Sequence, residues 1–269
     1  MVKKLFKHEF LSYARVMGIV YGILLTVAVA TKLFYVIEND TTIYQIIRGF
    51  TTLVYGGSVF AAAGFSFVMG IVRFYRNFFT AEGYLSFTLP VSAEQHIIVK
   101  AVTAVAVNAV TLIVVGLSGL IVLLGDELVL IWTQFCQAFG EVFGYLGADG
   151  VFFAIEAGIA LLLASFTSVM LYYCCISIGQ MAKKNRILAA VGVYFAYYIL
   201  TQIVSAVLTI TVTVVAASEA VWDIVQWIEF HPMEVIHIGL CGGIVLSAIF
   251  LLVEFMIVRG IMNKKLNLE

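Results

Sequence analysis

The sequence predicts an all-α integral membrane protein with six transmembrane helices. Hydrophobic residues make up 63% of its 269 residues and charged residues only 12%, whereas a soluble domain has about 25% charged residues. Six apolar stretches reach the roughly 20 residues that a helix needs to cross the hydrocarbon core of a bilayer. Most side chains are therefore expected to face lipid or one another, and residues 1–269 are predicted to form a single transmembrane domain.

The six predicted spans cover residues 16–37, 45–72, 101–124, 152–179, 187–217 and 236–258. All but two of the 15 basic residues lie before span one, between spans two and three, between spans four and five, or after span six. The opposite side holds only Lys32 and Arg48, together with most of the acidic residues. Because basic residues are retained on the cytoplasmic side, we expect both termini in the cytoplasm.

The segment 2–15, before the first span, is amphipathic when it is placed on a helix. Its apolar face consists of Val2, Leu5, Phe6, Phe10 and Tyr13 and continues to Met17. The other face carries Lys3, Lys4, Lys7, His8, Ser12 and Arg15, with Glu9 and Leu11 as exceptions to the pattern. This arrangement is typical of a helix in the membrane interface, with its cations toward anionic head groups. An ordinary basic segment flanking the membrane is the alternative.

The loop 125–149, on the predicted outer side, has a second amphipathic pattern. Its apolar residues recur at helical spacing: Leu128, Ile131, Trp132, Phe135, Phe139, Val142, Phe143 and Leu146. We therefore predict an interfacial or re-entrant helix in this loop. The segment 218–235 has a shorter pattern of the same kind, which ends at Pro232.

The segment 73–92, between spans two and three, mixes aromatic residues with arginine, glutamate and glycine before Pro90. Ser92 and Gln95 then have the spacing of a capping box, in which the two side chains bond backbone amides at the start of a helix. We predict a structured cytoplasmic element whose composition suits a protein–protein contact. A turn lying on the membrane surface is the alternative.

The run Glu82-Gly83-Tyr84-Leu85-Ser86-Phe87-Thr88-Leu89-Pro90-Val91-Ser92, followed by Ile97 and Lys100, resembles permease subunits of type-2 ATP-binding-cassette exporters. In that family this segment forms a cytoplasmic coupling helix that docks on a separate ATPase subunit, and the leader forms an N-terminal elbow helix. The resemblance implies that the ATPase subunit contacts Arg76, Asn77, Glu82, Gly83, Tyr84, Leu85 and Pro90. The helical loop 125–149 departs from the family, whose usual re-entrant element lies before the last span.

The resemblance further implies a bacterial plasma-membrane protein that exports a substrate by alternating access. Its partners would be a cytoplasmic ATPase subunit and a second permease subunit, in a homodimer or a heterodimer. ATP and magnesium would be bound by the ATPase, since a phosphate-binding loop needs a Gly-Lys pair and this chain has none. We expect the permease itself to have no enzymatic activity, no cofactor and no nucleic-acid partner.

Two other classes of function remain open. An ATP-independent secondary carrier or channel needs no ATPase, but such carriers usually rely on intramembrane carboxylates, and here Glu156 and Glu254 lie near span ends. The run Gly116-Leu117-Ser118-Gly119, with His237, matches part of the pattern of rhomboid intramembrane serine proteases, in which the serine needs a neighbouring base. Because Ser118 lies late in an outward-running span, helix packing by the glycines is the preferred interpretation.

Polar residues inside the spans are few. Asn108 and Gln202 are mid-span amides, which usually hydrogen-bond between helices. Span five also carries an i, i+4 row of hydroxyl groups, formed by Thr201, Ser205, Thr209 and Thr213. With the two amides, this row is the candidate lining of a translocation path or of a subunit seam. No spacing typical of metal ligands occurs.

Overall fold

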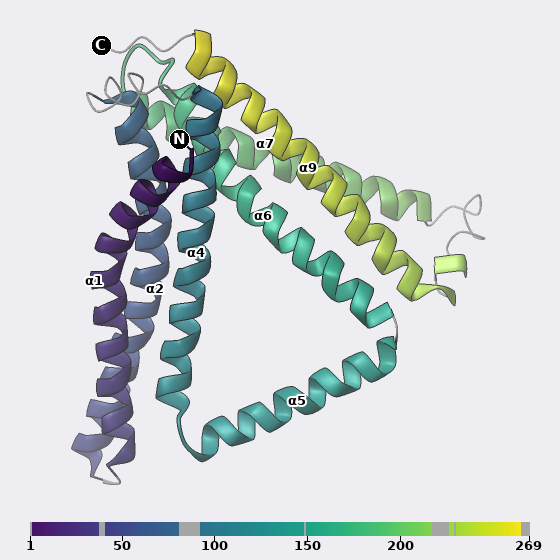
Figure 1. Cartoon of the computed structure of the whole chain (residues 1–269). Coiled ribbons are helices and arrows are strands. Elements are labelled where there is room, and N and C mark those ends of the chain that lie inside the picture. The colour runs from purple at the N-terminus through teal and green to yellow at the C-terminus, as the bar shows by residue number, and fades with distance from the viewer. Residues whose placement is uncertain are drawn as a thin grey trace. The chain divides into compact units, whose positions relative to one another are not determined.

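The computed structural model describes residues 2–37, 41–80, 92–147, 149–216, 226–228 and 230–264 (Figure 1). Within these ranges the regular secondary structure is helical and no strand occurs. Six of the described helices are long and apolar enough to cross a membrane. The predicted all-α fold, with six helices long and apolar enough to span a membrane, is therefore confirmed for the described residues.

The helices are α1 (Val2–Val36), α2 (Thr42–Phe79), α4 (Ala93–Leu123), α5 (Asp126–Leu146), α6 (Asp149–Gly179), α7 (Arg186–Ala216) and α9 (Pro232–Lys264). Each predicted span lies on one of these helices and extends at most one residue beyond it, and most of the helices are longer than the spans. The chain divides into two compact units, Met1–Tyr145 and Leu146–Glu269.

In the first unit, the leader and the first span form one continuous helix, α1. No glycine or proline interrupts residues 2–15, so the backbone has no reason to break before the span. Figure 1 shows the first turns of α1 inclined to the rest of the helix. Phe6 and Phe10 are half-buried and Tyr13 is buried, whereas Lys3 and Lys7 are exposed, so the amphipathic pattern is present. The leader is thus the beginning of α1 and not a separate helix.

The capping box predicted at the start of α4 is confirmed. The Gln95 backbone N–H donates to Ser92 Oγ at 3.3 Å, and the Ser92 backbone N–H donates to Gln95 Oε1 at 3.4 Å. These two bonds satisfy donors that the first helical turn leaves without an intrahelical partner. They fix the first residue of α4 directly after the segment that joins it to α2.

Helices α1, α2 and α4 pack against one another in pairs. The side chains of Met17, Leu24, Phe74, Phe78 and Ile97 lie in this packing and are at most 1% exposed. In a bilayer, lipid tails compete for apolar contacts, so close packing and hydrogen bonds between helices hold such a bundle together. The polar contacts of this unit therefore matter more than they would in a soluble protein.

Two basic residues that depart from the charge pattern bind carbonyl groups at helix ends. Arg48 Nε on α2 donates to the Phe34 carbonyl oxygen at 3.1 Å, and Arg48 Nη2 donates to the Tyr35 carbonyl oxygen at 3.4 Å. Lys32 Nζ on α1 donates to the Leu124 carbonyl oxygen at the end of α4. Cations at these positions offset the negative end of a helix dipole. Lys32 and Arg48 therefore have a structural role at the end of the unit opposite to the other basic residues.

Helix α5 confirms the helix predicted in the loop 125–149. Neighbouring rings along one face lie close together: Trp132 and Phe135 at 5.9 Å, Phe135 and Phe139 at 5.8 Å, and Phe139 and Phe143 at 4.4 Å between centroids. Trp132, Phe135 and Phe139 are exposed. The interfacial position of this helix remains a prediction.

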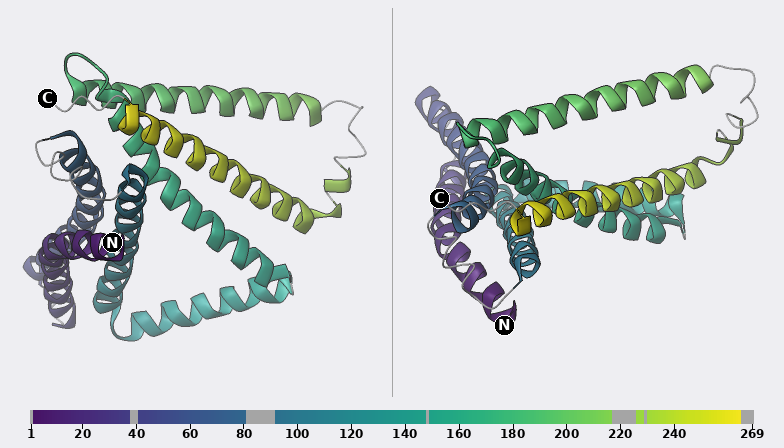
Figure 2. Two further views of the ribbon diagram at one scale, coloured as in Figure 1. Left: turned by 45° about the horizontal axis from the view of Figure 1, so that its top comes forward. Right: turned by 90° about the horizontal axis from the view of Figure 1, so that it is seen from above.

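In the second unit, α6 packs on both α7 and α9. Figure 2 shows the start of α7 beside the C-terminal end of α6. Gly179, at the end of α6, meets the start of α7 so closely that an added Cβ would lie 2.6 Å from Ala190 Cα. The buried residues of α6 are concentrated at this end, from Val169 to Gly179.

Candidate functional site

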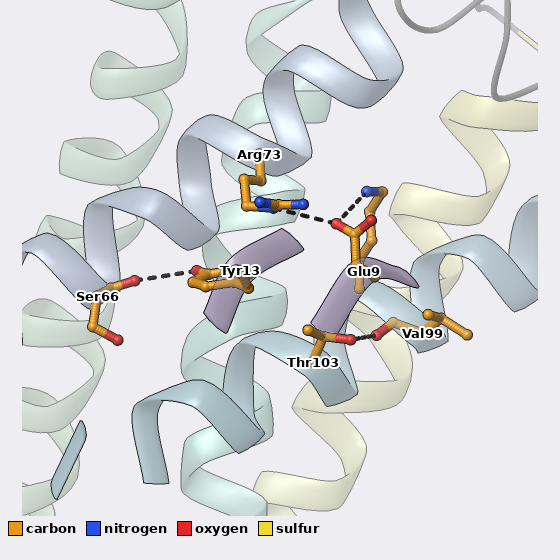
Figure 3. Close-up of polar contacts among 7 residues, drawn as sticks. Glu9, Tyr13, Ser66, Arg73, Val99 and Thr103 are labelled. Atoms are coloured by element: carbon orange, nitrogen blue, oxygen red, sulfur yellow. Dashed lines mark hydrogen bonds and ion pairs between the residues drawn. The ribbon is translucent and has the colours of Figure 1, made fainter. Parts of the chain in front are cut away.

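A cluster of charged side chains joins the three packed helices of the first unit at one end (Figure 3). Glu9 Oε1, on α1, lies 3.0 Å from Lys100 Nζ on α4 and 3.4 Å from Arg73 Nε on α2. The side chains of Glu9, Arg73 and Lys100 are 14%, 16% and 7% exposed. We call these three residues the Glu9 cluster. Each helix contributes one charged group, so a single carboxylate links all three.

Aromatic rings lie against both cations of the Glu9 cluster. Arg73 Cζ lies 4.9 Å from the centre of the Tyr13 ring, and Lys100 Nζ lies 5.3 Å from the centre of the Phe78 ring. The face of an aromatic ring carries negative electrostatic potential and attracts a cation. Because two cations share one carboxylate, the rings compensate part of the excess positive charge.

Hydrogen bonds continue from the cluster into the middle of the bundle. The Tyr13 hydroxyl donates to the Ser66 carbonyl oxygen at 3.2 Å. Ser66 Oγ donates to Asn108 Oδ1 at 2.7 Å and accepts from Thr111 Oγ1 at 3.0 Å. Thr111 Oγ1 also shares a hydrogen bond of 2.6 Å with the Tyr21 hydroxyl. The interhelical hydrogen bond predicted for Asn108 is therefore present, and it lies inside this unit.

The two cations of the Glu9 cluster flank the segment that joins α2 to α4. Arg73 precedes the end of α2 and Lys100 follows the start of α4 by about two turns each. On α2, residues 49–72 carry no charge and span about 36 Å, enough to cross the hydrocarbon core. The last turns of α2, from Arg73 to Phe79, therefore extend beyond that core. They form the first part of the predicted cytoplasmic segment 73–92.

Only two of the seven predicted ATPase-binding residues lie within the described part of the chain. Arg76 and Asn77 lie in the last turns of α2, where Arg76 is exposed and Asn77 is half-buried. The other five, namely Glu82, Gly83, Tyr84, Leu85 and Pro90, lie outside the described residues. The structure thus places two of the seven residues, at the end of the helix that Arg73 anchors.

The hydroxyl row predicted as a translocation path or subunit seam lies on α7. Ser205, Thr209 and Thr213 are exposed, as is Gln202, and Thr201 is half-buried. Thr209 Oγ1 donates to the Ser205 carbonyl oxygen, and Thr213 Oγ1 donates to the Thr209 carbonyl oxygen, both at 2.8 Å. The hydroxyl protons of Thr209 and Thr213 are therefore satisfied within the helix. This face is compatible with lipid or with a second subunit, and its role remains a prediction.

The residues of the protease alternative have other hydrogen-bond partners. Ser118 is fully buried, donates from Oγ to the Val115 carbonyl oxygen at 2.7 Å, and shares a hydrogen bond of 3.0 Å with the Tyr55 hydroxyl. His237 Nδ1 lies 2.7 Å from Glu156 Oε2. In the described ranges, no group of three or more His, Cys, Asp or Glu side chains is arranged to hold a metal ion. Neither contact of Ser118 supplies the base that a nucleophilic serine needs.

Sequence reasoning missed the Glu9 cluster, although one signal for it was present. Glu9 lies on the apolar face of the leader, four residues from both Leu5 and Tyr13. A charge in that position is costly to bury unless a partner compensates it. Nothing in the sequence states that Arg73 and Lys100 are the cations that face Glu9.

Comparisons of the chain with protein-family models, with curated proteins and with solved structures found no match. The resemblance to the exporter permeases therefore rests on residues 82–92 and on the six-span layout. Residues 82–91 lie outside the described ranges, whereas the six apolar helices are present. The Glu9 cluster is an additional feature, at the ends of the same segment.

Proposed function

We propose that this chain is the permease subunit of an ATP-driven exporter of the ATP-binding-cassette class, energised by a separate cytoplasmic ATPase subunit. The Glu9 cluster is the observation that carries the proposal. It ties both ends of the segment between α2 and α4 to one another and to α1. A segment that receives motion from a partner needs stiff attachments, because flexible ends would bend before the membrane helices moved.

The packing around the cluster supports this transmission of motion. Phe74 and Phe78, in the last turns of α2, and Ile97, in the first turns of α4, are completely buried. A displacement of residues 80–92 would therefore reach α1, α2 and α4 together. In the proposed cycle, ATP binding closes two ATPase subunits, the connecting segments follow them, and the two permease subunits change the side on which their path is open. This cycle is alternating access, and the separate ATPase subunits supply its energy from ATP.

Co-purification tests the proposal directly. The tagged full-length chain, extracted in mild detergent from membranes of its own source, should retain a P-loop ATPase that mass spectrometry identifies. Glu82→Lys and Tyr84→Ala should each weaken that association by about 2 kcal/mol, or roughly 30-fold, if these residues anchor the interface. Lys7→Gln, at an exposed position on α1, is the control and should retain the partner.

Three results separate the possibilities. If the wild-type chain transports its substrate in liposomes without any ATPase, the protein is a secondary carrier or a channel. If both segment variants bind the ATPase normally, the interface lies elsewhere on the chain. A third variant, Glu9→Gln, should keep the partner and its ATP hydrolysis but lose transport, because the attachment of the segment and not its docking surface is altered.

A further inference from the structure

The second unit contains a buried carboxyl group without a hydrogen-bond partner among the described residues. Glu254, on α9, is 4% exposed. Neither of its carboxyl oxygens has a hydrogen-bond partner among the described residues. It lies on the same helix as the buried Val258 and Met262, one and two turns before them. A carboxyl group in this position needs an explanation, because buried polar groups are almost always hydrogen-bonded.

Three ionisable groups of the neighbouring helices interact electrostatically with Glu254, and all three are neutral at neutral pH. They are the thiols of Cys174 and Cys175 on α6 and the phenol of Tyr197 on α7. On α9 itself the nearest basic residue is Arg259, five positions further on and thus about 140° around the helix. None of these three groups supplies a positive charge to compensate an ionised carboxylate.

The other intramembrane carboxylate of the same unit is a useful contrast. Glu156, on α6, lies 2.7 Å from His237 Nδ1 through one oxygen and accepts a hydrogen bond of 3.7 Å from Cys241 Sγ at the other. Both oxygens of Glu156 therefore have partners, whereas neither oxygen of Glu254 has one in the part of the chain that the structure describes. An isolated carboxylate in an apolar environment costs many kcal/mol, and such groups bind a proton instead.

We propose that Glu254 is a proton-binding site that couples proton occupancy to the packing of α9 against α6 and α7. With the proton bound, the carboxyl group is neutral and fits among the thiols, the phenol and the apolar side chains. When α9 moves and water reaches the group, the proton leaves to solvent and the carboxylate is hydrated. Because Glu254 lies where the three helices meet, loss of the proton favours an opened arrangement of this unit. The inference does not depend on an ATPase partner.

Linkage gives the sign of the expected effect. The packed state holds a proton that the opened or unfolded state releases, so raising the pH must destabilise the packed state. For one proton, the equilibrium constant for opening rises by up to about tenfold per pH unit across the titration range. Replacing the carboxyl group by the neutral, nearly isosteric amide of glutamine should abolish this dependence.

The test measures the unfolding equilibrium of the purified full-length chain in detergent between about pH 4 and pH 9, a range that begins near the ordinary pKa of a glutamate. Wild type and Glu254→Gln should have equal stability at the acidic end, and the variant should be the more stable protein at the alkaline end. The thiols and the phenol are present in both proteins, so the difference between the two profiles belongs to Glu254. Glu156→Gln is the matched control and should lower stability at neutral pH, because it disrupts a paired carboxylate.

A second measurement uses only the wild type. A hydrophobic carbodiimide, which reacts with protonated carboxyl groups, should modify Glu254 in preference to Glu156, with a yield that falls as the pH rises. Identical pH profiles of wild type and Glu254→Gln would overturn the proposal, as would failure of the variant to fold. Stabilisation of the wild type but not of the variant by added Na⁺ or K⁺ at constant pH would assign a metal-cation site instead.

Discussion

Glu9→Gln tests the central contact of the first unit. Glutamine keeps the shape of the side chain and an acceptor oxygen but removes the charge. Arg73 and Lys100, which both lie within 3.4 Å of the same oxygen, would then face each other without an anion. Lys100 is 7% exposed, so water screens its charge only slightly. We therefore expect a loss of stability well above that of an ordinary surface substitution.

The size of this loss follows from the geometry. At an effective dielectric constant of about 20, unit charges about 4 Å apart attract each other by about 4 kcal/mol. Desolvation of the three groups offsets part of this attraction, and the partial exposure of Glu9 and Arg73 weakens it further. Removing one partner of a fully buried ion pair costs about 3–5 kcal/mol. For this cluster we expect about 2–3 kcal/mol.

Reversible unfolding in mixed micelles measures the effect, and a double-mutant cycle assigns it. Glu9→Gln and Lys100→Gln should each destabilise the chain, and the double variant should be about 1–2 kcal/mol more stable than additivity predicts. Lys7→Gln, at an exposed position on the same helix, should change stability by no more than about 0.5 kcal/mol. If Glu9→Gln behaves like this control, or if the two cluster substitutions simply add, the cluster does not stabilise the unit.

Three further predictions concern other parts of the chain. In a background without native cysteines, an impermeant thiol reagent applied from outside should label a cysteine at Asp149 and not one at Lys184, and labelling at Lys184 would contradict the predicted orientation. Phe10→Glu should cost about 1–3 kcal/mol of stability, because Phe10 packs against the buried side chains of Tyr13 and Met17; unchanged thermal unfolding would make the leader an ordinary flank. Arg48→Gln should cost about 1–2 kcal/mol by loss of charge-assisted hydrogen bonds at the end of α1, and an unaltered unfolding curve would show that water replaces them.

The helices could be predicted from the sequence because they depend on properties of short segments. Twenty consecutive apolar residues, or a Ser-x-x-Gln box such as that at Ser92, act locally, and the structure contains both features. The leader was predicted less well. Its amphipathic face was predicted correctly. The continuity of α1, however, depends on the absence of glycine and proline before Gly18, and the distribution of apolar and basic residues around the helix does not show whether the backbone continues into the span.

Contacts between distant segments could not be predicted in the same way. Glu9 meets Arg73 and Lys100 across 64 and 91 positions of the chain, and no local pattern selects these two cations among 15 basic residues. The glycines of α2 show the same limit. An added Cβ at Gly70 would meet the Tyr13 hydroxyl at 3.2 Å, whereas Gly56 has no neighbour within 4 Å. Small residues permit close packing, but they do not identify the partner.

The long separation within the Glu9 cluster has a consequence for the order of events during synthesis. Glu9 emerges from the ribosome 91 residues before Lys100, and at about 5–20 residues per second this takes on the order of 5–18 s. During that interval Glu9 cannot yet contact Lys100. The bundle of α1, α2 and α4 therefore closes only after the third helix has begun to emerge, so the last of the three helices to be made completes the charge balance of the first.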